Sequence, residues 1–228
     1  MGTDLKHLRL QTKKILSLLR KEYPEAEIAL RFSNPLELLI ATILSAQCTD
    51  ERVNKVTPIL FSRYKKALDY ANAEQSELEQ EIRSTGFFRN KAKSIIACCR
   101  GIVEGHKGSL PETMEELTRL PGIGRKTANV VLGGAFGVSA GVVVDTHVRR
   151  TSQRLGLTGN DDPEKIELEL MQLVSQPDWF NWGNLLIHHG RRVCHARNPE
   201  CTVCVLKKLC PSAGHLGVKT RKAVGKGR

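Results

Sequence analysis

Apolar residues recur at helical spacing along most of the chain. Between positions 5 and 21, leucines and isoleucines are separated by intervals close to three or four residues, which places them on one face of a helix. Similar patterns continue through most of the sequence. We expect helices at residues 5–21, 35–47, 51–63, 67–71, 75–84, 90–105, 111–118, 125–135, 146–155, 163–174 and 178–189.

Capping residues mark several ends of these helices. Asn34 and Asp162 each precede a proline, an arrangement that opens a helix. Asn90 can cap the helix at 90–105, and Ser109 with Glu112 resembles a capping box for the helix at 111–118. Gly156 ends another helix. The only candidate strand, residues 142–144, is three residues long, so the predicted fold class is all-α.

Composition indicates a soluble globular protein with no membrane span. The chain has 228 residues, of which 40% are hydrophobic, and no apolar run approaches the roughly 18 residues that cross a bilayer. The N-terminus carries mixed charges and lacks the apolar core of a secretory signal. We therefore expect a cytoplasmic location.

Positive charge is concentrated near the C-terminus. The formal net charge is +11, and residues 191–228 hold ten Lys or Arg against one acid, Glu200. Phosphate is the natural partner of such a segment. The glycines and lysines from about residue 217 onward, with no aromatic residues, predict a disordered basic tail.

A tight turn joins two of the predicted helices at Leu120-Pro121-Gly122-Ile123-Gly124. The turn leaves backbone N–H groups unpaired at the start of the next helix, and such groups bind phosphate without reading bases. Arg125 and Lys126 follow at once. Lys126 could contact a phosphate or act as a nucleophile, and the second role requires a neutral amine.

Asp145 precedes a helix beginning Thr146-His147, so its plain interpretation is an N-cap. We expect His147, His188 and His189 to be hydrogen-bonded packing residues rather than catalytic groups or metal ligands.

Four cysteines lie within seventeen residues, at Cys194, Cys201, Cys204 and Cys210. Four thiolates can bind either zinc or an iron–sulfur cluster. Zinc modules usually combine two close pairs, whereas this set contains one Cys-x2-Cys. The seven cysteines form an odd number, which argues against a disulfide framework.

The combination of Leu-Pro-Gly-Ile-Gly-Arg-Lys, Val-Asp-Thr-His and the cysteine spacing resembles the endonuclease III family over roughly residues 5–210. These enzymes are DNA glycosylases with abasic-site lyase activity. The resemblance implies a six-helix barrel at 28–138, with a helix-hairpin-helix at about 111–131. It also implies an iron–sulfur domain formed by 1–27 with 139–228, and a DNA cleft between the two.

The same resemblance assigns chemistry to individual residues. Lys126 would attack C1′ of a flipped-out nucleotide and form a Schiff base, and Asp145 would assist it by stabilising positive charge on the sugar. Gly122, Gly124 and Arg125 would hold the DNA backbone. The four cysteines would hold a 4Fe–4S cluster, surrounded by a basic loop that includes Arg197 and Lys207.

Two loops resemble the parts of these enzymes that open the duplex. Gln47 would fill the gap left by the flipped nucleotide; its alternative is an ordinary polar residue at a helix end. Phe87 would form a second wedge, although the family commonly has leucine then tyrosine where this chain has Phe87 and Phe88. Core packing is the alternative for Phe87.

The expected function is base excision repair of oxidised or ring-saturated pyrimidines by a monomer acting on damaged double-stranded DNA. In a bacterial cell it would associate with the nucleoid when bound to DNA. Two alternatives remain at this stage. An adenine-specific mismatch glycosylase shares the hairpin, aspartate and cluster but generally lacks the lysine. A non-catalytic DNA-binding protein would use hairpin and cluster only to grip the duplex.

Overall fold

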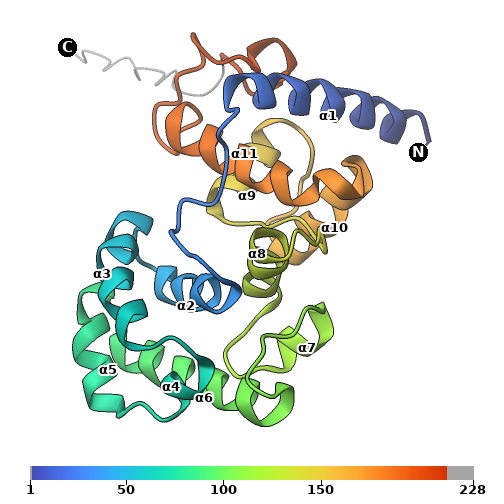
Figure 1. The fold of residues 1–228 in the computed structure, drawn as a ribbon. Coiled ribbons are helices and arrows are strands. Elements are labelled where there is room, and N and C mark those ends of the chain that lie inside the picture. Colours follow the sequence, from blue (N-terminus) through green and yellow to red (C-terminus); the bar gives the residue numbers. More distant parts are fainter. Residues whose placement is uncertain (1, 215–228) are drawn as a thin grey trace, which may run out of the picture. The chain divides into compact units, whose positions relative to one another are not determined.

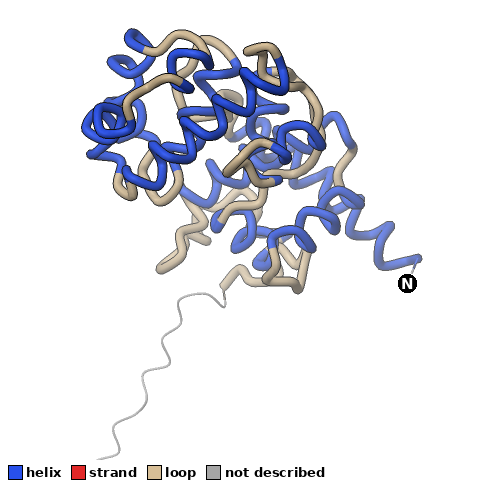
Figure 2. The backbone as a smooth tube through the Cα atoms, turned by 90° about the horizontal axis from the view of Figure 1, so that it is seen from below, coloured by secondary structure: helices blue, strands red, loops and turns tan. Residues whose placement is uncertain are grey.

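The structure is a computed structural model that describes the chain from residue 2 to residue 214. Within this range it consists of helices and loops without strands, which confirms the all-α prediction (Figure 2). The tail predicted to be disordered lies outside the described residues. None of the helices in this range is long and apolar enough to span a membrane.

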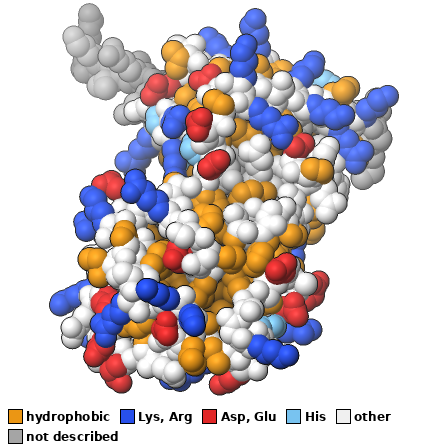
Figure 3. Space-filling view, in the orientation of Figure 1, with side chains coloured by type: hydrophobic (Ala, Val, Ile, Leu, Met, Phe, Trp, Pro, Cys, Tyr) orange, Lys and Arg blue, Asp and Glu red, His pale blue; other side chains and the backbone are white. Residues whose placement is uncertain are grey.

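The chain divides into two compact units (Figure 1). The central unit comprises Glu27–Val143 with the short segment Gln176–Phe180. The terminal unit comprises Met1–Ala26, Val144–Ser175 and the chain from Asn181 onward. The assignment of these parts to a barrel and an iron–sulfur domain stays a prediction. Lys and Arg side chains are visible on both units (Figure 3).

An almost wholly apolar helix forms the centre of the central unit. This helix, α2 (Pro35–Ser45), buries Leu38, Leu39, Ile40 and Ala41 completely, so apolar side chains face every direction. It packs against α3, α6 and α8. The unit's other elements are α3 (Asp50–Arg63), α4 (Ala67–Ala71), α5 (Gln75–Ile82), η1 (Arg83–Thr85), α6 (Phe88–His106), α7 (Met114–Arg119), α8 (Arg125–Ala135), η2 (Gln176–Asp178) and the first two residues of α11 (Trp179–Arg192).

The terminal unit has a separate set of buried side chains. It contains α1 (Gly2–Glu22), α9 (Thr146–Arg154), α10 (Pro163–Leu173), most of α11 (Trp179–Arg192) and η3 (Lys207–Leu209). Leu19, Leu170 and Trp182 from three of these helices are fully buried. Gln11 of α1 donates hydrogen bonds to the carbonyls of Leu155 and Leu209, at 3.2 and 2.9 Å. α1 is thereby tied to two segments far away in the sequence.

Three predicted helix ends are confirmed. The Asn34 side chain accepts a hydrogen bond from the Glu37 N–H at 3.0 Å, and Asp162 accepts one from the Lys165 N–H at 2.9 Å. Gly156 follows the end of α9 and adopts a φ of +71°, which suits glycine.

Other predicted ends differ from those in the structure. α7 begins after Thr113, whose hydroxyl accepts a hydrogen bond from the Glu116 N–H, so the N-cap lies four residues beyond Ser109. α6 begins at Phe88, which leaves Asn90 inside the helix. α2 ends at Ser45, two residues earlier than expected.

A close contact explains why a remote segment joins the central unit. Gly133 of α8 lies against the ring of Phe180, so that a Cβ added at Gly133 would come within 2.0 Å of Phe180 Cδ2 and 2.4 Å of its Cγ. A contact at Cγ cannot be relieved by moving only the far end of the ring. Glycine at this position therefore allows Phe180 to pack on α8.

We predict that Gly133→Ala lowers the free energy of unfolding by about 1–2 kcal/mol, because overpacking outweighs the gain in helix propensity. The matched control is Gly105→Ala in α6, where an added Cβ meets nothing within 4 Å. That variant should gain about 0.5–1 kcal/mol. Denaturant melts of both variants measure the difference, and equal stability would contradict the packing assigned to Gly133.

Candidate functional site

The helix-hairpin-helix comprises α7, the turn at residues 120–124 and α8. Gly122 has a φ of +78°, and the N–H of Ile123 donates to the Leu120 carbonyl at 3.1 Å. The Ile123 side chain is buried while both glycines are exposed. Ile123 thus anchors the turn, and its glycine backbone faces outward, where it can approach a ligand closely.

Gly124 is the N-cap of α8 and has no side chain with which to cap it. The first N–H groups of a helix lack partners within the helix, and they carry the positive end of the helix dipole. This helix start therefore has the backbone chemistry of an anion site.

Lys126 lies in the first turn of α8 and its side chain is exposed, with half-buried Arg125 preceding it. The structure thus places Gly122, Gly124, Arg125 and Lys126 on one hairpin of the central unit.

Asp145 is half-buried and caps α9, as the plain interpretation predicted. Its Oδ1 accepts hydrogen bonds from the N–H groups of His147 and Val148, both at 2.8 Å. Within the described part of the chain, both hydrogen bonds that the Asp145 side chain accepts end on Oδ1. One carboxylate oxygen is therefore sufficient for the cap, and Oδ2 can serve another purpose. Asp145 belongs to the terminal unit and Lys126 to the central unit.

Gln47 and Phe87 both occupy exposed turns of the central unit, and both have positive φ angles, of +51° and +46°. The Phe87 side chain is 62% exposed, which rules out core packing. Phe88 is the residue that packs against the core. A large exposed apolar side chain held in a left-handed turn is an unusual feature that packing does not explain.

The four cysteines of the C-terminal loop line one cavity in the terminal unit. Leu155, His189 and Leu206 contribute to the same lining. Within residues 2–214, however, no three or more His, Cys, Asp or Glu side chains are grouped closely enough to hold a single metal ion.

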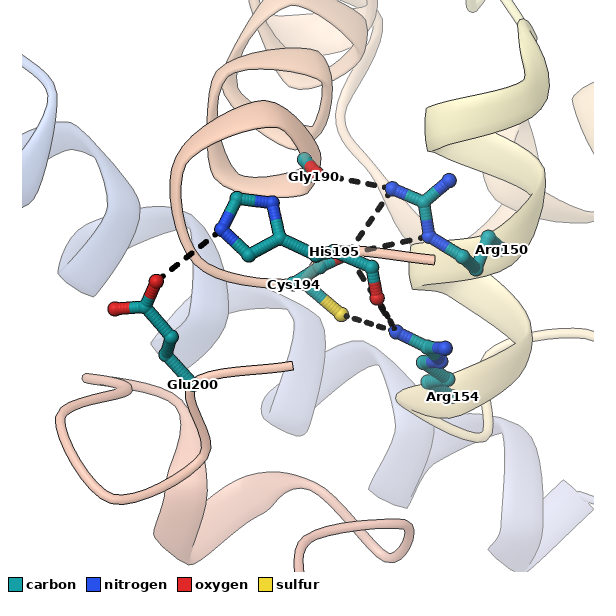
Figure 4. A network of polar contacts seen from close by, with 6 residues as sticks. All are labelled: Arg150, Arg154, Gly190, Cys194, His195 and Glu200. Carbon is teal, nitrogen blue, oxygen red and sulfur yellow. Dashed lines mark hydrogen bonds and ion pairs between the residues drawn. The ribbon is translucent and has the colours of Figure 1, made fainter. Parts of the chain in front are cut away.

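Two arginines of α9 bind the loop that carries Cys194 (Figure 4). Arg150 donates to the carbonyls of Gly190 and Cys194, at 2.9 and 3.0 Å. Arg154 donates to the His195 carbonyl at 2.7 Å and approaches the Cys194 sulfur at 3.3 Å. The helix whose N-terminus is capped by Asp145 thus fixes the cysteine loop through two later turns.

The histidines form hydrogen bonds within the terminal unit, as expected. His189 is buried between the Tyr23 hydroxyl, 3.0 Å from its Nδ1, and the Cys204 sulfur, 3.6 Å from its Nε2. Burial lowers the pKa of His189 to about 4, so the ring is neutral at pH 7. His147 Nδ1 lies 3.2 Å from Arg150.

Burial raises the pKa of the Cys204 and Cys210 thiols, and Cys194 and Cys201 raise both pKa values further. Four thiolates in one cavity would repel one another, whereas metal ligation requires thiolates. Positive charge must therefore come from elsewhere, and Arg154 supplies part of it. A bound metal centre is a natural source of the rest.

Sequence reasoning missed Arg150 and Arg154, because their contacts span about forty positions of the chain. Their spacing of four on a predicted helix showed only that they share a face.

Comparison with known proteins agrees with these features. A family model described as HhH-GPD superfamily base excision DNA repair protein matches residues 40–176. The endonuclease III of Synechocystis sp. (strain ATCC 27184 / PCC 6803 / Kazusa) is 60% identical over 200 residues, which cover 88% of this chain and 91% of that protein.

Two solved structures are similar in fold. One is a non-covalent endonuclease III–DNA complex, with a TM-score of 0.85 and 44% identity. The other is a trapped covalent endonuclease III–DNA intermediate, with the same TM-score and 43% identity. Each match covers 90% of this chain and 96% of the other. The chain therefore belongs to the endonuclease III family, within the HhH-GPD superfamily of base excision DNA repair proteins.

Proposed function

We propose that the protein is a bifunctional DNA glycosylase that removes oxidised or ring-saturated pyrimidines and then cuts the abasic strand. The observation that carries this proposal is Lys126, a lysine in the first turn of a helix entered through an uncapped glycine turn. The chain as a whole is similar to proteins named endonuclease III, and one solved structure of that name is a trapped covalent intermediate with DNA.

The reaction follows from the chemistry of an amine at C1′. The Lys126 nitrogen forms a bond to C1′ while the bond from C1′ to the base breaks, and the sugar then opens to a Schiff base. Loss of a proton from C2′ breaks the bond between C3′ and its phosphate oxygen. This β-elimination cuts the strand on the 3′ side of the lesion, and water releases the enzyme from the Schiff base.

The hairpin holds the DNA for this step. Gly122 and Gly124 let a phosphate approach the backbone N–H groups at the start of α8, and Arg125 adds a positive charge. Such contacts do not read bases, which suits an enzyme that meets lesions in any sequence.

Gln47 and Phe87 open the duplex at the lesion. A stacked sugar does not expose C1′ to the amine, so the nucleotide must leave the helix and its place must be filled. Gln47 fills the gap, and Phe87 separates a base step as an aromatic wedge. The exposure of both residues supports these roles.

Asp145 stabilises the positive charge that develops on the sugar and helps remove a proton from Lys126. The cap on α9 occupies Oδ1, so Oδ2 is the atom for this task.

The family implies a metal centre in general, and we propose that it is a 4Fe–4S cluster held by Cys194, Cys201, Cys204 and Cys210. All four cysteines line one cavity, and their spacing with a single Cys-x2-Cys favours a cluster over the two close pairs usual for zinc. When bound, the cluster supplies positive charge and cross-links the loop. Arg150 and Arg154 orient that loop from α9.

The covalent step is tested by borohydride reduction on a duplex containing an abasic site. We predict that wild-type protein is trapped and that both Lys126→Ala and Lys126→Arg lose trapping completely. The arginine variant is the matched control, because it keeps the charge that binds phosphate while a guanidinium stays protonated. Undiminished trapping in either variant would show that Lys126 is not the nucleophile. If the wild-type protein bound the DNA but was not trapped, it would be a DNA-binding protein without the covalent step.

Asp145→Asn separates the cap from the catalytic role. Asparagine caps helices about as well as aspartate, so the melting temperature should stay within about 1–2 °C of wild type. Base excision should nevertheless fall by on the order of 10²-fold or more, since the charge is gone. The control is Asp162→Asn, which changes the cap of α10 in the same way and should excise normally. If Asp145→Asn kept near wild-type turnover, the only role of Asp145 would be to cap α9.

Metal analysis tests the cluster. Purified protein should be brown and contain iron and acid-labile sulfide in equal amounts, and Cys204→Ser should lose most of both. Cys48→Ser, which changes a cysteine outside the loop, should keep them. A colourless protein with one zinc per chain would contradict the cluster.

A further inference from the structure

Lys91 of α6 is a buried lysine with an unusual set of neighbours. Its side chain is only 5% exposed, and within residues 2–214 it forms no ion pair. Lysine is almost never fully buried unless its charge is paired. Burial lowers the pKa of Lys91 below its ordinary value, which shows that desolvation opposes its charge. Something in the structure must favour this placement.

The ammonium of Lys91 joins the ends of two other elements. Its Nζ donates to the Leu44 carbonyl at 2.7 Å and to the Thr85 carbonyl at 2.8 Å. Leu44 lies in the last turn of α2, and Thr85 is the last residue of η1. Carbonyls in the last turn of a helix lack partners within the helix and carry the negative end of its dipole. The ammonium of Lys91 therefore provides hydrogen bonds to carbonyls at the ends of α2 and η1 that lack partners within those helices.

Each of these carbonyls is followed closely by one of the two residues assigned to opening the duplex. Gln47 lies three residues after Leu44, and Phe87 lies two residues after Thr85. The described residues include four non-glycine positions with positive φ, and Gln47 and Phe87 are two of them. Such conformations persist only where the surrounding structure enforces them.

The backbone of Lys91 reinforces the second of these turns. Its N–H donates to the Phe87 carbonyl at 3.1 Å, and the Thr85 hydroxyl donates to the Ile82 carbonyl at 2.8 Å. The exposed Phe87 ring thus projects from a backbone held on both sides, and the same lysine also holds the end of α2.

We propose that Lys91 is a positioning residue that fixes the Gln47 turn and the Phe87 turn relative to each other, so that both side chains enter the duplex at one lesion. The proposal rests on the proposed function, because it assigns Lys91 to the wedge residues of that same reaction. It differs from a purely structural role, in which Lys91 would stabilise the fold without affecting how the duplex is opened.

The test compares Lys91→Met with Lys93→Met, a change of an exposed lysine on the same helix that removes the same charge. Strand cutting is measured at an abasic site in a fully paired duplex and at the same site within a short unpaired bubble. For Lys91→Met we expect about a 10- to 100-fold loss on the duplex, since misplaced wedge groups must open it. On the bubble, which is already open, the loss should be no more than about twofold. Lys93→Met should match wild type on both.

A double-mutant cycle provides the second measurement. If Lys91 acts through the two turns, Lys91→Met should cause little further loss on the duplex in a background carrying Gln47→Ala and Phe87→Ala. If Lys91→Met does not fold, as judged by its helical circular dichroism, Lys91→Gln replaces it and the same pattern is expected.

The possible failures are distinguishable. Absence of cutting and trapping by wild type would overturn the proposed function itself. If wild type cuts, equal losses for Lys91→Met on duplex and bubble, or full additivity in the cycle, would overturn the positioning role. Wild-type rates for Lys91→Met on the paired duplex would overturn it as well.

Discussion

The residues to which we assign a function in catalysis and duplex opening share one constraint, because they lie at the ends of helices. Helices satisfy their own polar groups everywhere except in their first and last turns. The residues assigned to function lie at those places: Lys126 at the start of α8, Asp145 before α9, Gln47 after α2 and Phe87 before α6. The packed helices of each unit fix the positions of these helix ends.

Helix α9 shows how one element can connect two functions. Asp145 caps its start, while Arg150 and Arg154 bind the backbone of the cysteine loop from later turns. Anything that orders the cysteine loop therefore also orders the helix that presents Asp145.

Local chemistry made much of this predictable from the sequence. The bounds of α4 and α8 agree with the expected ranges, and Asn34, Asp162 and Asp145 cap as their residue types suggest. The errors arose where two residues could provide the same local signal, as with Ser109 and Thr113. The left-handed start of α6 at Phe87 had no such signal, since a phenylalanine rarely adopts that conformation. The contacts of Lys91 and Arg154 reach across forty or more positions, which periodicity and capping cannot show.

In the proposed reaction one amine, that of Lys126, becomes bonded to the sugar of a damaged nucleotide. Peptide mass spectrometry of the protein after reductive trapping on abasic DNA and nuclease digestion locates this bond. We expect a sugar remnant on Lys126 and on no other lysine. A remnant located on a different lysine or on the N-terminal amine would contradict it.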